Sequence, residues 1–212
     1  MSLWEELAGK ANGTILDLGC GTGRVTSHLV RRGHEVTGLD LDERLIDALA
    51  DAEIGDARDF QLDRRFALVL APMQLIQLFA DREERIRCLE CVAGHLAPDG
   101  LAAFAIVESM PEPVDSAAPL PDTRELDGWV YSSLPLDATV ADGAIHVRRL
   151  RQTVSPKGEL AEQVDEIALR TLDASTLEEE ARRAGLRSAG RRPVPPTEAH
   201  VGSTVVLLEG EA

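Results

Sequence analysis

Features that mark membrane, secreted or disulfide-bonded proteins are missing from this 212-residue chain. No apolar run approaches the roughly 18 residues that a membrane-spanning helix needs. Residues 2–10 are polar and acidic, unlike the apolar core of a secretory signal. The three cysteines are an odd number that does not suit a disulfide framework, and they favour a reducing compartment. The sequence therefore predicts a cytoplasmic protein that does not associate with a membrane.

Positive charge is scarce as well. The chain has 22 basic residues against 37 acidic ones, which gives a net charge of −15. Because contacts to phosphate supply most non-specific affinity for nucleic acids, so acidic a chain is a poor candidate for binding DNA or RNA. A local basic cluster does occur at Arg148, Arg149 and Arg151. We interpret this cluster as a solvated strand edge.

The length and composition suit a single domain. A chain of this size can bury roughly 70% of its unfolded surface around one core, and 44% of its residues are hydrophobic. No internal repeat or low-complexity tract divides the chain. We expect one domain over residues 1–212.

Two residue patterns resemble reactive sites but have simpler explanations. Cys88, Cys91 and His95 lie in one predicted helix, whereas structural zinc wants four ligands, normally from two separated pairs. The Cys-x-x-Cys pair stands in the middle of that helix, not at its N-terminus where a redox thiolate is stabilised. The histidines are scattered and form no Ser-His-acid signature. We therefore predict no metal site and no nucleophilic triad.

The most informative segment is a glycine-rich run over residues 15–24, ILDLGCGTGR. It predicts a buried strand, a tight turn and a helix over residues 25–32 that is closed by Gly33. Glycines allow positive φ angles and let a ligand approach the backbone closely. The dinucleotide-binding fingerprint needs a third glycine or alanine, but Arg24 and Thr26 stand at that place in the two registers. The run is therefore not a dinucleotide fingerprint.

An acid follows the next predicted strand. Residues 34–40 alternate apolar positions and end in Asp40, roughly 20 residues past the turn, where an acid can accept hydrogen bonds from ribose hydroxyls. Asp40 could instead cap a helix over residues 42–52, because aspartate is a preferred N-cap. Both roles are compatible if Asp42 lies nearer the cap.

Further elements continue the alternation of strand and helix. Residues 66–71 form a continuous apolar run typical of a strand buried on both faces. Residues 82–96 have helical spacing, and residues 101–107 form another apolar strand after a turn at residues 95–100. Between the second and fourth strands, Gly55 and Asp56 are typical of a turn.

Together these segments resemble class I S-adenosylmethionine-dependent methyltransferases, whose first motif is acidic-x-Gly-x-Gly-x-Gly. The resemblance covers about residues 12–108. It implies an α/β fold with a doubly wound, Rossmann-like sheet of seven strands, the last antiparallel. It also implies the cofactor S-adenosyl-L-methionine, bound by Asp17, Gly19, Cys20, Gly21, Gly23, Asp40, Leu41, Asp56, Ala57, Ala71 and Met73.

The resemblance gives several of these residues a role. Asp40 would hold the ribose and Leu41 would lie against the adenine. Asp56 would accept from the adenine amino group, and the Ala57 N–H would donate to the ring. The predicted helical lead-in over residues 1–14 is shorter than the cofactor-covering arm of small-molecule members. The anchor for the methionine carboxylate is therefore open, with Arg24 and Lys10 as candidates.

The second half of the chain predicts an excursion before the last helix. Residues 109–127 are rich in proline and acids and predict an irregular connection. Strands are predicted over residues 129–135, 144–154 and 159–172, although the last run also suits a helix. Residues 109–172 would form an insertion with a small antiparallel sheet over the active site, or else a homodimer surface. Ser175 and Glu178 predict a capping box, and residues 186–196 and 201–208 predict closing strands joined by a turn around Glu198.

The excursion resembles that of small-molecule methyltransferases such as glycine, sarcosine and aminosugar N-methyltransferases. This resemblance implies an enzyme that transfers a methyl group to N, O or C of a small-molecule acceptor by in-line displacement. The acceptor would lie between residues 72–77 and the excursion. A non-catalytic, cofactor-binding regulatory or scaffold subunit is the alternative. Catalytic residues are not identified; polar groups that could orient an acceptor are Gln74, Gln77, Glu108, Tyr131 and His146.

Overall fold

The computed structural model describes residues 3–46, 49–109, 121–126, 128–196 and 202–211. By their contacts the residues group into two compact units. The first unit, which we call the core unit, comprises residues 1–108, 172–195 and 202–212, and the second, the excursion unit, comprises residues 109–171 and 196–201. No helix among the described residues is long and apolar enough to cross a membrane.

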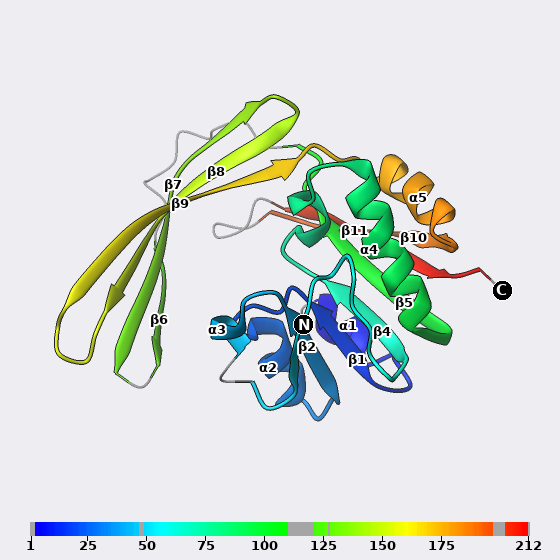
Figure 1. Cartoon of the computed structure of the whole chain (residues 1–212), viewed down its shortest axis with the longest axis horizontal. Coiled ribbons are helices and arrows are strands. Elements are labelled where there is room, and N and C mark those ends of the chain that lie inside the picture. The colour runs from blue at the N-terminus through cyan, green and yellow to red at the C-terminus, as the bar shows by residue number, and fades with distance from the viewer. Residues whose placement is uncertain (1–2, 47–48, 110–120, 127, 197–201, 212) are drawn as a thin grey trace. The chain divides into compact units, whose positions relative to one another are not determined.

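Strands and helices alternate through the first half of the chain (Figure 1). The bounds are α1 Leu3–Ala8, β1 Ile15–Leu18, α2 Arg24–Val30, β2 Val36–Asp40, α3 Glu43–Ile46, β3 Ala52–Ile54, β4 Phe66–Ala71, the 3₁₀ helix η1 Leu75–Leu78, α4 Arg82–His95, β5 Leu96–Ile106, β6 Asp122–Leu126, β7 Trp129–Ala141, β8 Ala144–Val154, β9 Leu160–Arg170, α5 Ala174–Arg183, β10 Leu186–Val194 and β11 Ser203–Gly210.

The core unit is built on a seven-stranded sheet with the order β10-β11-β5-β4-β1-β2-β3. The pairs β1–β2, β1–β4, β2–β3 and β4–β5 are parallel, whereas β11 is antiparallel to both β5 and β10. The predicted doubly wound sheet with an antiparallel last strand is thereby confirmed. Because β1 and β4 are adjacent although β2 and β3 lie between them in sequence, the strand order reverses at β1. Ligands of open α/β sheets bind at such a point.

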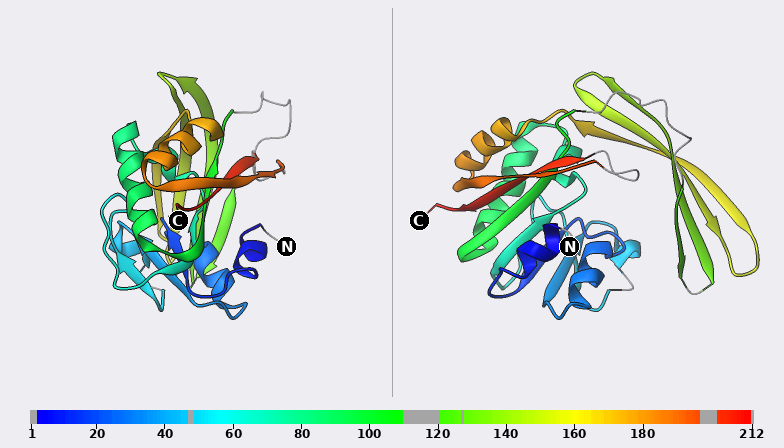
Figure 2. Two further views of the ribbon diagram at one scale, coloured as in Figure 1. Left: turned by 90° about the vertical axis from the view of Figure 1, so that its right-hand side faces the viewer. Right: turned by 180° about the vertical axis from the view of Figure 1, so that it is seen from behind.

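Helices cover both faces of this sheet (Figure 2). On one face, α4 and α5 pack over a cluster that includes Phe66, Phe104 and Val206. On the other, α1 and α2 contribute Leu7 and Leu29 to a separate cluster. A strand buried on both faces reads as a continuous apolar run, which is the pattern of β4.

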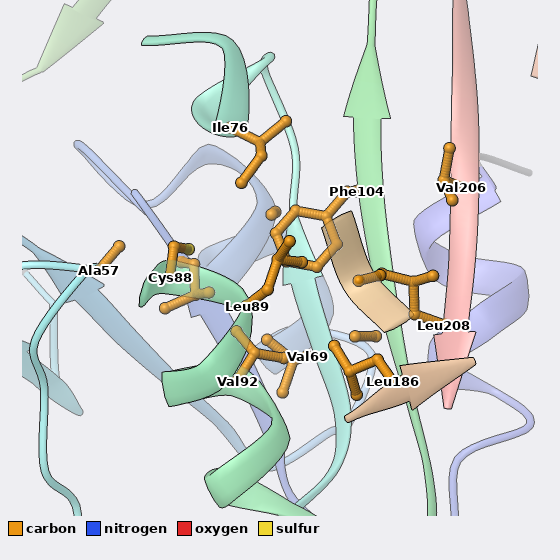
Figure 3. Close-up of a cluster of buried hydrophobic side chains, with 14 of the residues drawn as sticks. Ala57, Val69, Ile76, Cys88, Leu89, Val92, Phe104, Leu186, Val206 and Leu208 are labelled. Atoms are coloured by element: carbon orange, nitrogen blue, oxygen red, sulfur yellow. The ribbon is translucent and has the colours of Figure 1, made fainter. Parts of the chain in front are cut away.

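The larger cluster is closed by α4 (Figure 3). Cys88, Leu89 and Val92 are fully buried on the face that this helix turns toward β4 and β5. The helix begins where the Asp81 carboxylate accepts from the Glu84 N–H at 2.9 Å, an N-cap of the usual kind. Truncating a fully buried leucine such as Leu89 to alanine costs about 2–5 kcal/mol.

A buried ion pair joins the two helices on that face. Arg85 of α4 donates two hydrogen bonds to the Glu180 carboxylate of α5, at 2.8 and 2.7 Å. Glu180 is almost completely buried. Removing either partner would leave the other charge buried and unpaired, which is strongly destabilising.

The excursion unit contains a four-stranded antiparallel sheet with the order β6-β7-β8-β9. The three predicted strands are present, and the ambiguous third run is the strand β9. The prediction of an irregular connection over residues 109–127 is wrong for its last part, because residues 122–126 form β6 and pair with β7. Residues 110–120 lie outside the described residues.

Two further predictions need correction. The N-cap of α5 is Asp173, whose carboxylate accepts from the Thr176 N–H at 2.9 Å, and not Ser175. Strand β5 begins at Leu96, within the predicted turn, because Leu96 pairs with Phe66 before the register shifts. The predicted turn around Glu198 lies outside the described residues.

Candidate functional site

The glycine loop follows β1 at the carboxyl edge of the parallel strands. Gly19, Gly21 and Gly23 have φ angles of 65°, 53° and 75°, in the left-handed region that favours glycine. The loop is fixed to the next strand, since the Gly19 N–H donates to the Leu39 carbonyl at 2.8 Å. The predicted strand, turn and helix are therefore present, with α2 beginning at Arg24.

Neighbouring side chains explain two of these glycines. A Cβ on Gly19 would lie 3.0 Å from Leu75 of η1, and one on Gly23 would lie 2.2 Å from Leu49. A Cβ on Gly21 would meet no atom within 4 Å. The loop thus packs against the segment that follows β4, while its middle glycine faces open space into which a ligand could fit.

Asp17 is completely buried at the end of β1. One carboxylate oxygen accepts from the Thr26 N–H at 3.1 Å and from the Thr26 hydroxyl at 2.7 Å. The other oxygen is buried and has no hydrogen-bond partner among the described residues. Burial raises the pKa of the Asp17 carboxyl to about 6, against the opposing effect of its bonds to Thr26. An unpaired buried acceptor is costly, so a cationic or donor group of a ligand would be stabilised beside it.

Asp40 closes the other side of the loop. Its two carboxylate oxygens accept from the Gly21 N–H at 2.8 Å and from the Asp42 N–H at 3.0 Å. An ionised carboxylate has further lone pairs that can accept from a ligand hydroxyl. Asp42 carries the bond to the Arg44 N–H at the start of α3. Asp40 faces the loop, and Asp42 lies nearer the helix α3, which begins at Glu43. The predicted helix over residues 42–52 is wrong for its last part, because residues 49–51 are not helical and β3 begins at Ala52. The ribose role of Asp40 stays a prediction.

Cys20 is a packing residue of the loop. A Cβ on Gly38 would lie only 2.7 Å from the Cys20 sulfur, so β2 needs a glycine at position 38. Burial, followed by the nearby carboxylates of Asp17 and Asp40, raises the pKa of the Cys20 thiol to about 12. A thiol held neutral in this way is a poor nucleophile.

The turn after β3 carries Asp56 and Ala57. The Gly55 N–H donates to the Asp40 carbonyl at 2.9 Å, which places this turn beside the end of β2. Arg58 holds the Asp56 carboxylate at 2.9 and 2.7 Å and also donates to Glu84 at 2.6 Å. These bonds lower the pKa of Asp56, chiefly through the Arg58 side chain. Asp56 is therefore ionised and oriented, and its side chain remains partly exposed.

Exposed apolar side chains flank the loop. Leu41 follows Asp40 and is 67% exposed, and Met73 follows β4 and is 54% exposed. Ala71, at the end of β4, is buried. A planar or aliphatic group of a ligand could cover the two exposed apolar side chains at the carboxyl ends of β2 and β4.

The backbone after β4 is strained. Met73 and Gln74 have φ angles of 60° and 61°, a left-handed conformation that costs a non-glycine residue roughly 1–2 kcal/mol. Such strain is common in functional loops. Gln77 lies in the same segment but is fully buried, and its amide exchanges hydrogen bonds of 3.0 and 2.7 Å with the backbone of Val107.

The two candidates for the carboxylate anchor differ in position. Lys10 pairs with Glu6 of α1 at 2.7 Å, on a helix that packs over one sheet face. Arg24 begins α2 directly after the glycine loop, and its guanidinium lies 2.7 Å from the Met73 sulfur. Arg24, and not Lys10, therefore belongs to the group of residues around the loop.

Tyr131 and His146 are in the excursion unit, on opposite faces of its sheet. Tyr131 pairs with Thr153 of β8 and so shares its face. His146 and Thr153 are an odd number of positions apart on β8, whose pairing with β9 is regular, so their side chains point to opposite faces. His146 Nδ1 lies 3.2 Å from a Glu166 carboxylate oxygen. A single ligand lying on one face of this sheet could not contact both Tyr131 and His146.

Other polar groups named from the sequence have structural partners. Glu108 accepts from the Ala174 N–H and the Thr204 hydroxyl, at 2.9 and 2.6 Å. His95 donates from Nδ1 to the Cys91 carbonyl at 2.7 Å, and its Nε2 accepts from the Leu62 N–H at 3.0 Å. The described residues contain no group of three metal-ligating side chains.

Two hollows lie away from the glycine loop. One, of about 390 Å³, is lined by residues of α1 together with Arg32 and His34. The other, of about 430 Å³, is lined by residues 61–65 with Gly94 and His95. Because His34 precedes β2 and residues 61–65 precede β4, both lie at the amino edge of the sheet. Ligands of parallel α/β sheets bind at the carboxyl edge.

Sequence reasoning missed three residues that shape the site. Thr26 holds Asp17, Leu75 packs on Gly19, and Arg58 orients Asp56. A hydroxyl residue in the first turn of the helix after the glycine loop was the available signal for Thr26. Leu75 and Arg58 carry no such signal, since their roles depend on contacts made in three dimensions.

The strand order and the glycine loop at the carboxyl edge define an α/β protein with a doubly wound sheet. Residues 15–100, about two fifths of the chain, match the family described as a methyltransferase domain. In overall fold the chain is similar to an S-adenosylmethionine-dependent methyltransferase from Clostridium acetobutylicum, with a TM-score of 0.73 and 15% identity. The superposition covers 99% of this chain and 91% of that one, and it establishes a shared fold.

Two relatives are similar in sequence. A cypemycin N-terminal methyltransferase from a Streptomyces species is 35% identical over 97 residues, which are 42% of this chain and 40% of that protein. A dTDP-3-amino-3,4,6-trideoxy-alpha-D-glucopyranose N,N-dimethyltransferase from Streptomyces venezuelae is 30% identical over 127 residues, 57% of this chain and 48% of that protein. The aligned regions thus span less than half of each relative.

Proposed function

We propose that this chain is an S-adenosylmethionine-dependent methyltransferase that acts on an amino group of a small molecule. The match to a methyltransferase domain over residues 15–100 supports the class of reaction. The two relatives methylate nitrogen by name, one on a peptide N-terminus and one on an amino sugar, which favours nitrogen over oxygen or carbon.

The arrangement of Asp40 over the glycine loop is the observation that carries the proposal. Its carboxylate is already held beside Gly21, where no side chain fills the space. A ribose could be bound there by charge-assisted hydrogen bonds, each of roughly 1.5–3 kcal/mol. Leu41 would cover the adenine, and Asp56, oriented by Arg58, would accept from its amino group.

The unpaired oxygen of Asp17 suits the charges of this cofactor. S-adenosylmethionine carries an ammonium and a sulfonium, and both are cationic. A buried carboxylate oxygen without a partner, next to the acid Asp40, offers a negative environment for such groups. The two negatively charged phosphates of NAD would be repelled by the carboxylates of Asp17 and Asp40, which flank the loop.

The chemistry requires little from side chains beyond positioning. The bound sulfonium supplies an electrophilic methyl group and a neutral thioether as leaving group. The loop residues hold the donor, and the strained segment at Met73 and Gln74 lies at the adjoining strand end, where an acceptor could be oriented in line with the methyl group. Holding two reactants in this way can supply up to roughly 7–11 kcal/mol of the barrier.

The acceptor also needs cover from water. The excursion unit would supply that cover, or it would form a homodimer surface. Because Tyr131 and His146 lie on opposite sheet faces, at most one of them would contact an acceptor on a given face. We expect the enzyme to act in the cytoplasm, where both the cofactor and reduced cysteines occur.

Calorimetry and an acceptor screen test the proposal. The protein should bind S-adenosylmethionine and S-adenosylhomocysteine, and bind NAD much more weakly. It should then transfer labelled methyl groups to members of a panel of small amines, including amino sugars and short peptides. Equal or tighter binding of NAD would contradict the cofactor assignment. Tight cofactor binding without turnover on any class of acceptor would favour the regulatory or scaffold subunit instead.

A further inference from the structure

Arg24 stands out among the basic residues at the carboxyl edge of the sheet. Arg44 is paired with Asp42 at 2.7 Å, and Arg58 is paired with Asp56 and Glu84. The guanidinium of Arg24 instead contacts the Met73 thioether, and it forms no ion pair with any carboxylate in the part of the chain that the structure describes. A thioether is only a weak hydrogen-bond acceptor.

The surroundings make this unusual. Asp17 of β1 and Asp40 of β2 flank the glycine loop, and the chain has a net charge of −15. An exposed arginine in such an acidic protein commonly finds a carboxylate partner, and the described residues contain several such pairs. Arg24 keeps its charge available at the strand ends, next to the loop that would hold the cofactor.

The methyl donor carries charges of both signs. Its sulfonium and ammonium suit Asp17 and Asp40, but its α-carboxylate would be repelled by these acids. A zwitterionic end therefore needs a cation close to the glycine loop. Lys10 does not provide it, because it pairs with Glu6 on α1.

We propose that Arg24 binds the α-carboxylate of the methyl donor, in exchange for its contact with Met73. The inference rests on the proposed function and assigns one end of the same site. A guanidinium presents a planar fork of donors that matches a carboxylate. The charge-assisted bonds are stronger than the bond to sulfur that they replace. Release of Met73 would also free its side chain to contact the reacting groups.

The residues at the two ends of the loop would then bind opposite charges of the ligand. Asp17, before the glycines, provides the negative charge for the ammonium, and Arg24, after them, provides the positive charge for the carboxylate. The loop then distinguishes ligands that carry an amino-acid end from nucleosides that lack it.

Two ligands separate this role from a general effect on the loop. S-adenosylhomocysteine has the α-carboxylate, and 5′-methylthioadenosine keeps the adenosine and thioether but lacks the amino-acid end. In Arg24→Ala, the dissociation constant for S-adenosylhomocysteine should rise by roughly 10- to 100-fold, the loss of a charged hydrogen-bond partner. The constant for 5′-methylthioadenosine should stay within about twofold.

Control variants complete the experiment. Arg24→Lys should recover part of the affinity for S-adenosylhomocysteine, because it restores the charge without the fork. Arg31→Ala, at the other end of α2, removes an exposed arginine of the same helix and should bind both ligands as the wild type does. Loss of affinity for both ligands in Arg24→Ala, or for neither, would overturn the assignment of Arg24. Failure of the wild-type protein to bind S-adenosylhomocysteine would instead contradict the proposed function itself.

Discussion

Glu108 and Ala174 stand at the two ends of the excursion and are joined by a hydrogen bond of 2.9 Å from the Ala174 N–H to the Glu108 carboxylate. The second carboxylate oxygen accepts from the Thr204 hydroxyl of β11 at 2.6 Å. The chain therefore leaves the core unit and returns to it at neighbouring points. Leu172, just before α5, is already buried in the core cluster.

This closure makes the excursion removable. Replacing residues 110–171 by a short glycine linker should leave a folded core unit, because both hydrophobic clusters belong to that unit. The variant should bind S-adenosylhomocysteine as the full chain does, since Asp17, Asp40 and Asp56 are retained. If the excursion covers the acceptor, the variant should lose methyl transfer to the acceptor found with the full chain, because that cover from water is removed. An unchanged rate in a folded variant would rule out a lid.

Substitution of Gln77 should have a large effect on stability. Its amide satisfies both the N–H and the carbonyl of Val107 in a fully buried position. Gln77→Leu would leave these two groups without partners and should lower the free energy of unfolding by about 2–4 kcal/mol. Urea denaturation measures this loss.

Gln74 is the matched control in the same segment. It is partly exposed and left-handed, so Gln74→Gly should keep or slightly raise stability by relieving strain. If Gln74 orients the acceptor, this variant should lose turnover while it remains folded. Equal destabilisation by the two substitutions would contradict the assignment of Gln77 to stability and of Gln74 to the acceptor.

The difference between these two glutamines was beyond sequence reasoning. Val107 lies 30 residues from Gln77, so only the packing of η1 against β5 brings them together. The same holds for β6, whose strand character comes from pairing with β7. Local patterns were sufficient for β1, β2 and β4, where apolar runs and glycines determine the element.

The N-cap of α5 was predicted wrongly for a related reason. Asp173 and Ser175 are both good N-caps, and the choice depends on which residue is extended; Asp173 is, with φ −94° and ψ 158°. The alternation of side chains along a strand gives the face of Tyr131 relative to other residues of β7, and the face of His146 relative to other residues of β8, but it does not relate the two strands. The pairing of Tyr131 with Thr153 is needed to compare these faces, and the register shift between Pro135 and Asp137 is not visible in the sequence.

Asp40 should matter for ligand binding more than for folding. Asp40→Ala removes an acceptor for the ribose and should weaken S-adenosylhomocysteine by about 1.5–3 kcal/mol. It also frees the N–H groups of Gly21 and Asp42, which can bind water at this partly exposed site, so the loss of stability should stay below about 1 kcal/mol. Asp42→Ala is the control, because that side chain serves Arg44. Normal ligand affinity in Asp40→Ala would show that the ribose assignment is wrong.

Asp17 should make the stability of the ligand-free protein depend on pH. Its pKa is raised from 3.8 to about 6 on folding, mainly by burial. The folded state therefore binds the proton more tightly than the unfolded state does. The contribution of Asp17 is most favourable below pH 3.8 and is lost as the pH rises through about 6. The ionised side chain then costs the folded protein about 3 kcal/mol at neutral pH.

Asp17→Asn isolates this contribution. The amide oxygen can still accept from Thr26, but the side chain no longer ionises. Urea denaturation of both proteins at several values between pH 4 and pH 7.5 gives the difference in unfolding free energy, in which the other titrating groups cancel. This difference should move in favour of Asp17→Asn by about 2–2.5 kcal/mol over this pH range. The variant should also bind S-adenosylhomocysteine more weakly, because the ammonium loses its charged partner. Parallel pH profiles for the two proteins would mean that Asp17 does not carry a raised pKa. Because Asp17 with an ordinary pKa would still be ionised at neutral pH, the assignment of its charge to the ammonium is tested by the binding measurement: unchanged affinity of Asp17→Asn for S-adenosylhomocysteine would contradict it.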